Sequence, residues 1–102
     1  MQLDLNTLQK EVYQNKVNHH FNVTDTNFEL LLMHGELNEL FRGILKHDQA
    51  NIQEEIADVA IYLLGLAEIL HVDLGQAIVD KLHIDEQRVY EKDGSKHLKG
   101  TD

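Results

Sequence analysis

The stretch EEIADVAIYLLGLAEIL, residues 54–70, is the most apolar part of the chain, and its pattern favours a helix. On a helical wheel at about 100° per residue, Glu55 and Asp58 share a sector with a row of apolar side chains. That row consists of Val59, Tyr62, Leu66 and Ile69. Burying an unpaired carboxylate costs several kcal/mol, so each acid in this sector needs a partner. The partner is a basic side chain, a helix terminus or a metal ion.

The composition indicates one small domain without a disulfide framework. The chain has 102 residues, 42% of them hydrophobic, and no cysteine, which fits a reducing compartment and a core that oligomerisation would enlarge. No apolar run approaches the ~20 residues that span a bilayer, and the start MQLDLNTLQKEV lacks the apolar segment of a signal peptide. We therefore expect a soluble cytoplasmic protein, with an all-α domain over 1–91 and a polar tail, a candidate lid, over 92–102.

The formal net charge of −9 argues against several kinds of partner. Duplex binding depends on Lys and Arg side chains that neutralise phosphates, so we expect no duplex nucleic acid and no membrane as partner. In so acidic a chain, a phosphate-bearing ligand requires a cation or a local basic cluster.

Hydrophobic periodicity predicts four helices and no strand, which is an all-α, four-helix bundle-like fold. The expected helices cover about residues 5–19, 25–46, 51–71 and 73–90. Their expected N-caps are Thr24 or Asp25 for the second helix, Asn51 or its rival Asp48 for the third, and Asp73 for the fourth.

A second pair of acids lies in HGELNEL, where Glu36 and Glu39 project from one helix face at i, i+3 spacing. Taken alone, this pair could belong to a solvated face shared with Asp25 and Glu29. If the second and third helices pack antiparallel, however, the two pairs can face each other across a small volume. Four negative charges need cations there, and an all-oxygen set selects Mg²⁺ or Mn²⁺ over zinc.

These residues resemble the MazG-like family of all-α nucleoside triphosphate pyrophosphohydrolases, which is related to dCTP pyrophosphatases and dimeric dUTPases. The shared pattern is E-x-x-E, a spacer, then E-x-x-D, and it continues through EEIADVAIYLLGLAEILHVDLGQAIVDKL. The resemblance implies Mg²⁺-dependent cleavage of a (d)NTP between the α and β phosphates, and assembly as a homodimer or homotetramer. It implies Glu36, Glu39, Glu55 and Asp58 as metal ligands, with Glu36 or Glu39 in the catalytic role of activating water.

Relatives usually carry K-x-x-x-N-x-x-R-x-Y in the last helix, and four positions of this chain correspond to that motif. The corresponding residues, implied as substrate-binding, are Lys81, Asp85, Arg88 and Tyr90. Asp85 replaces the asparagine and removes an amide donor. Lys92 and Lys96 in the tail are implied to close over phosphates, and Met33 stands where many relatives have a further glutamate.

Two other functions remain open from the sequence. Met33 and Asp85 favour a non-catalytic dimeric module that binds nucleotide or a protein. The pairs Glu68/His71 and Asp80/His83 have the acid–histidine spacing of a di-iron or di-manganese carboxylate bundle. The aromatic side chains are expected in the core rather than as base-stacking platforms; they are Phe21, Phe28, Phe41 and Tyr62.

Overall fold

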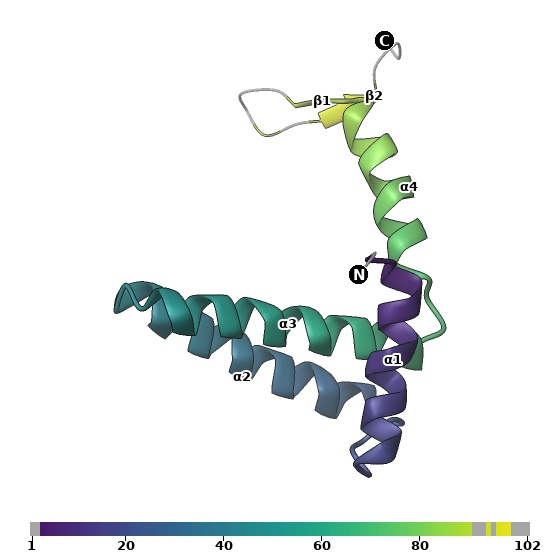
Figure 1. Cartoon of the computed structure of the whole chain (residues 1–102). Helices are drawn as coiled ribbons and strands as arrows, with labels where there is room; N and C mark the ends of the chain where they lie inside the picture. Colours follow the sequence, from purple (N-terminus) through teal and green to yellow (C-terminus); the bar gives the residue numbers. More distant parts are fainter. Residues whose placement is uncertain (1–2, 91–93, 95, 99–102) are drawn as a thin grey trace.

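The expected all-α fold with four helices is confirmed in a computed structural model of the chain, which describes residues 3–90, 94 and 96–98 (Figure 1). The helices are α1 (Leu5–Asn18), α2 (Thr26–Leu45), α3 (Gln49–Ile69) and α4 (Leu74–Glu86). Two short strands follow, β1 (Arg88–Tyr90) and β2 (Lys96–Leu98). Within the described part of the chain, no helix combines the length and apolarity needed to cross a membrane.

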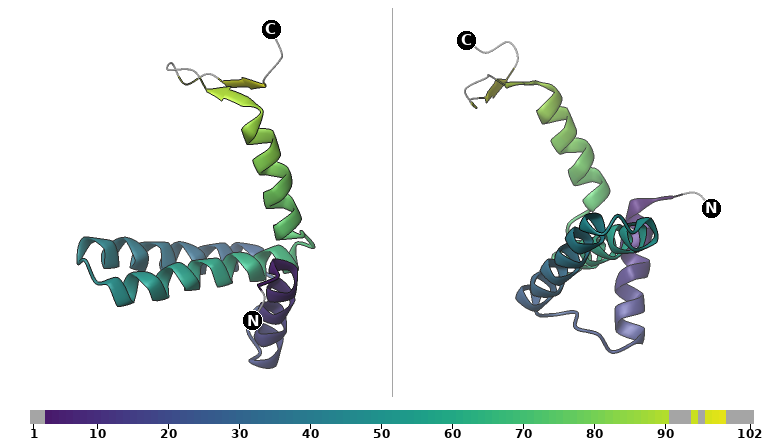
Figure 2. Two further views of the ribbon diagram at one scale, coloured as in Figure 1. Left: turned by 45° about the horizontal axis from the view of Figure 1, so that its top comes forward. Right: turned by 90° about the vertical axis from the view of Figure 1, so that its left-hand side faces the viewer.

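The helices α2 and α3 lie side by side as a hairpin, and α1 crosses the C-terminal half of α3 (Figures 1 and 2). The buried apolar side chains gather at this crossing, where Leu64, Leu66 and Ala67 are each less than 10% exposed. Gly65 allows the close approach of the two helices, because a Cβ there would lie 3.3 Å from side-chain carbons of Val12 and Lys16. The core is therefore small and lies at one end of the hairpin.

Aspartate side chains begin the helices, and histidines stand just beyond three of their ends. Asp25 and Asp73 are the expected N-caps, and each accepts a hydrogen bond from a backbone N–H of the first turn. The prediction of Asn51 as a cap is wrong. Its rival Asp48 caps α3 and accepts from the Asn51 N–H at 3.2 Å. Just past the C-termini of α1, α2 and α3, the backbone turns left-handed at His20, His47 and His71, with φ of 55–59°.

The prediction that the last helix reaches Tyr90 without any strand is wrong. α4 ends at Glu86, and β1 pairs antiparallel with β2 in the register Arg88↔Leu98 to Tyr90↔Lys96. The β-branched and aromatic pair Val89-Tyr90 suits a strand, and the partner lies only a few residues on. Gly94, with φ of 92°, supplies the left-handed conformation in the connection. Lys92 and the side chain of Lys96, expected in a lid, lie outside what the structure describes.

α4 stands away from the hairpin and packs chiefly against α1 (Figures 1 and 2). The joint between α3 and α4 is fixed by Gln9 of α1, which is only 2% exposed. Its amide donates to Glu68 at 2.8 Å and to the Val72 carbonyl at 2.6 Å, and its oxygen accepts from the Leu74 N–H. Glu68 is therefore engaged by a structural partner.

The expectation that the phenylalanines form the core is wrong. Phe21, Phe28 and Phe41 are 45–59% exposed, whereas Tyr62 is half-buried. The physical reason is the small number of helices packed on one another within the chain, since much of α2, α3 and α4 has no neighbour to cover it.

Candidate metal centre and adjoining pocket

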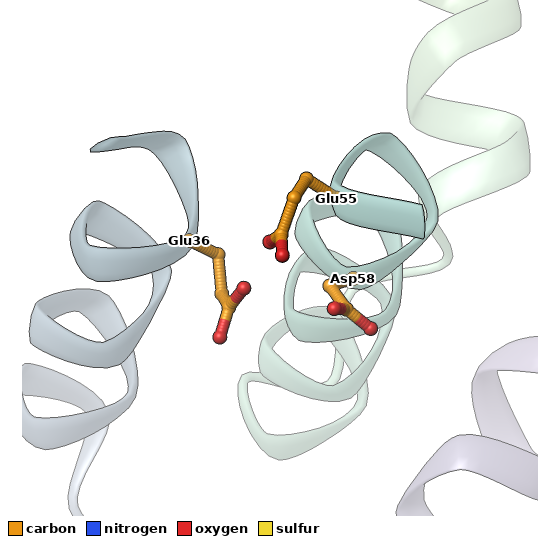
Figure 3. Close-up of side chains that lie close together, drawn as sticks. All are labelled: Glu36, Glu55 and Asp58. Atoms are coloured by element: carbon orange, nitrogen blue, oxygen red, sulfur yellow. The ribbon is translucent and has the colours of Figure 1, made fainter. Parts of the chain in front are cut away.

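Three of the expected metal ligands converge between α2 and α3. Glu36 projects from α2 toward α3, where Glu55 points back at it and Asp58 lies beside them one turn further along α3 (Figure 3). One carboxylate oxygen from each lies within 4.8 Å of the others, and all three residues are half-buried. The i, i+3 spacing on α3 explains why both of its acids face the same neighbour.

The electrostatics of this acidic cluster show that the carboxylates repel one another. The pKa of Glu55 is raised from an ordinary 4.5 to about 7. The first cause is the contact with Glu36, which becomes a hydrogen bond when one of the two carboxyls carries a proton. Burial and the negative charges of Glu36, Asp58 and Glu39 add to it. The Oε2 atom of Glu55 is buried and has no hydrogen-bond partner in the described part of the chain.

The structure narrows the choice of partner for these acids. Among the described residues, no ion pair involves Glu36, Glu55 or Asp58. Glu55 is the seventh residue of α3, beyond the first turn in which the helix dipole favours an acid. The structure thus supports neither a basic side chain nor a helix terminus as the partner of these acids. Three carboxylates at this separation are suited to a hard divalent cation, which binds oxygen ligands and would relieve their repulsion.

Glu39, the fourth expected ligand, lies one turn beyond Glu36 on α2 and is exposed. It is not one of the three residues whose oxygens meet within 4.8 Å. Its charge nevertheless contributes to the raised pKa of Glu55, so it acts electrostatically on the cluster. Its assignment as a ligand and catalytic residue stays a prediction.

A pocket of about 600 Å³ adjoins the cluster and shares Asp58 with it. Its walls come from α1, the α1–α2 connection, α2 and α3. The alternative that Glu29 lies on a solvated face of α2 is wrong, because Glu29 is only 1% exposed and pairs with Lys16 of α1. The signal that could have found this pair is the spacing of Gln9, Val12 and Lys16, which share the face of α1 that packs on α3.

The expected phosphate-binding residues lie on α4 and β1, which project away from the α2–α3 hairpin that carries the acidic cluster (Figure 1). The Asp85 carboxylate lies between two cations, with Lys81 Nζ at 3.2 Å and Arg88 Nη1 at 3.4 Å from Oδ1. The side chain of Tyr90 is outside the described part. Asp85 thus interacts with both cations that were expected to meet phosphates.

The acid–histidine pairs expected for a di-iron site are not brought together. Among the described residues, the one cluster of suitable metal-binding atoms contains carboxylates and no histidine. His71 occupies the left-handed position after α3, and Glu68 is bound to Gln9. The structure therefore gives no support to the di-iron or di-manganese bundle.

The four helices and the oxygen-only acidic cluster define the class, an all-α protein with a site suited to a divalent cation. Comparison with protein families gives a more particular assignment. The model of the MazG-like family matches residues 29–100, and the chain belongs to this family.

Three curated proteins are similar to part of this chain. The chain is 49% identical over 41 residues to dCTP pyrophosphatase 1 of Mus musculus, covering 40% of this chain and 24% of that protein. It is 39% identical over 64 residues to the proteins of the same name from Rattus norvegicus and Homo sapiens, covering 53% of this chain and 38% of each of them. The chain thus spans about a quarter to two fifths of the length of these relatives. No solved structure matches it significantly.

Proposed function

We propose that this protein is a Mg²⁺-dependent nucleoside triphosphate pyrophosphohydrolase that cleaves a (d)NTP between the α and β phosphates, giving a (d)NMP and pyrophosphate. The single observation that carries the proposal is the cluster of Glu36, Glu55 and Asp58 in a chain of the MazG-like family. The names of the matched relatives make dCTP the first substrate to examine.

In this proposal the residues of the chain have distinct roles. Glu36, Glu55 and Asp58 hold the cation, with Glu39 as the fourth ligand. A bound Mg²⁺ or Mn²⁺ supplies positive charge to the phosphates and makes water more acidic. Glu36 or Glu39 accepts the proton of the attacking water, and Lys81 and Arg88 offer donors to phosphate oxygens.

The experiment is a product screen on the purified protein with the common NTPs and dNTPs, first with Mg²⁺ and then with EDTA. Monophosphate and pyrophosphate that appear only with the metal support the proposal. Asp58→Asn should abolish turnover, whereas Glu54→Gln, a matched change at an exposed acid of the same helix, should leave it intact. Triphosphate binding without any product would favour the non-catalytic module, and a fully active Asp58→Asn protein would refute the site.

We also propose that the working form is a homodimer or homotetramer. The Cα radius of gyration is 17.1 Å, against about 13 Å for a compact domain of 100 residues. The accessible surface is 7873 Å², against about 5,900 Å² for a compact monomer of 11.8 kDa. The excess of about 2,000 Å² per chain is in the range that obligate dimers bury. Apolar side chains more than half exposed include Leu31, Phe41, Ile56 and Leu82.

In this proposal a second copy brings the cations of α4 to the acidic cluster, since within one chain α4 stands away from the α2–α3 hairpin that carries the cluster (Figure 2). Subunit mixing tests this arrangement. Asp58→Asn and Arg88→Ala should each be inactive alone. After unfolding and refolding together, random pairing should restore about a quarter of the wild-type activity, because half of the dimers carry one complete site of two. No recovery in mixed dimers, or full activity in a monomer shown by light scattering, would contradict the proposal.

A further inference from the structure

The buried ion pair of Lys16 and Glu29 has no part in the proposed chemistry, yet it lines the pocket beside the acidic cluster. Ion pairs of this kind are costly to bury, and apolar residues of similar volume often replace them without loss of stability. Lys16 is 8% exposed and Glu29 1%. The pair therefore calls for a role other than stability.

The hydrogen bonds around the pair engage both Glu29 oxygens but leave two of the three Lys16 N–H donors without a partner among the described residues. Both Glu29 oxygens are engaged, one by Lys16 and the other by the Asn22 amide at 3.1 Å. Asn22 is itself saturated, because its amide also donates to the Asp25 carbonyl and its oxygen accepts from the Thr24 and Asp25 N–H groups. The Lys16 ammonium has three N–H donors, and Glu29 is the one acceptor found for it in the described part of the chain.

Much of the remaining surface of the pocket is apolar, which suits stacking of a heteroaromatic ring. Its walls are mostly apolar and aromatic, and include Val12, Phe28, Ile61 and Tyr62. The Lys16 ammonium lies 5.9 Å from the centre of the Tyr62 ring. The Tyr62 hydroxyl is a further donor, since burial and nearby carboxylates raise its pKa and keep it protonated.

The position of the pocket sets how a nucleotide would lie in it, and this step rests on the proposed function. Asp58 belongs to both the cluster and the pocket, so phosphates held at the cluster direct the base into the pocket. Tyr62 follows Asp58 by four residues of α3, about 6 Å along the axis. The Lys16 side chain contacts α3 further on, at Gly65, where a Cβ would lie 3.3 Å from a Lys16 carbon. The edge of the base farthest from the phosphates would meet Lys16.

We propose that Lys16, held in place by Glu29, determines base specificity and selects nucleotides with a carbonyl oxygen, rather than an amino group, at pyrimidine C4 or purine C6. A carbonyl there accepts a charge-assisted hydrogen bond from the ammonium. An amino group presents hydrogens to the Lys16 ammonium, which can only donate. The buried ammonium then has no acceptor on the ligand. Glu11 and Asn15, which could accept from an amino group, are exposed, and the third such acceptor, Asp58, is assigned to the cation in the proposed function.

The test compares kcat/KM for two pairs of substrates that differ at this position, dUTP with dCTP and dITP with dATP. The wild-type protein should favour the carbonyl member of each pair by about 10- to 100-fold. The double variant Lys16→Met/Glu29→Leu removes the ion pair without leaving a lone buried charge, and the preference should fall to within about threefold. Lys10→Met, at an exposed lysine of the same helix, is the matched control and should retain the wild-type preference.

The possible outcomes distinguish three cases: Lys16 and Glu29 set base specificity, the pair is only structural, or the proposed reaction does not occur. A uniform loss across all four nucleotides would assign the pair a structural role and overturn the proposal. Equal or better turnover of dCTP than dUTP by the wild-type protein would also overturn it. If no triphosphate is hydrolysed, the proposed reaction fails, and calorimetric binding of dUMP against dCMP decides the specificity alone. Tighter dUMP binding that depends on Lys16 supports it, and equal binding or none refutes it.

Discussion

Binding of a divalent cation to the acidic cluster should release a proton that Glu55 holds in the metal-free protein. With a pKa of about 7, Glu55 is about half protonated at pH 7, whereas an ordinary glutamate with a pKa of 4.5 is less than about 1% protonated. A cation binds the carboxylate form, so binding displaces the proton. We expect release of about 0.9 proton per site at pH 6, about 0.5 at pH 7 and about 0.1 at pH 8.

The assay is isothermal titration of Mg²⁺ or Mn²⁺ into metal-free protein, in buffers with different ionisation enthalpies. The slope of the observed enthalpy against the buffer enthalpy gives the number of protons released. Glu55→Gln cannot release this proton, and its slope should be close to zero, with weaker binding. Glu54→Gln, whose exposed side chain is one position away, should behave as the wild-type protein does.

Two results would refute this reasoning. Cation binding at pH 6 without proton release would show that Glu55 is already ionised, so that the three carboxylates do not share the close space shown in Figure 3. Unchanged proton release in Glu55→Gln would place the proton on another group.

The remaining predictions concern stability. Because the folded-state pKa of Glu55 lies above its ordinary value, the metal-free protein should lose free energy of unfolding as the pH rises from about 4.5 to about 7. Thermal melts across this range measure the loss; saturating Mg²⁺ should remove it, and a melt independent of pH would contradict it. His47→Gly should raise the free energy of unfolding by about 1 kcal/mol, because glycine adopts the left-handed conformation there without strain; a lower melting temperature would refute this. Lys16→Met alone should cost about 3–5 kcal/mol by leaving Glu29 buried without its cation, whereas Lys16→Met/Glu29→Leu should recover most of that cost in denaturant titrations. Equal stability of the single and double variants would show that Lys16 and Glu29 are not energetically coupled.

The helices were predictable from the sequence because helix formation depends on local patterns. The apolar row on α3 and the aspartate caps at Asp25 and Asp73 are each contained within a few consecutive residues. The end of α4 was not predictable in this way. Residues 88–90 form a strand instead of a further helical turn because they pair with β2. This partner lies outside the short stretch of sequence from which a helix is predicted.

The site was predictable in part for the same reason. The placement of Glu55 and Asp58 on the apolar side of one helix follows from spacing alone, and their need for a partner follows from the cost of burying charge. The choice of Glu36 as the acid that meets them, with Glu39 outside the three-residue cluster, depends on how α2 is rotated against α3. That rotation is set by packing between helices, which the pattern of one helix does not specify.

The sequence by itself therefore determined the four helices, the acidic character of the site and the two acids that require a partner. The tertiary structure alone decided that Glu29 is buried against Lys16 and that α4 stands away from the hairpin. Both depend on contacts between segments distant in the chain. A charged residue looks the same in sequence whether its helix face meets water or another helix, and only the packing of the neighbour distinguishes the two.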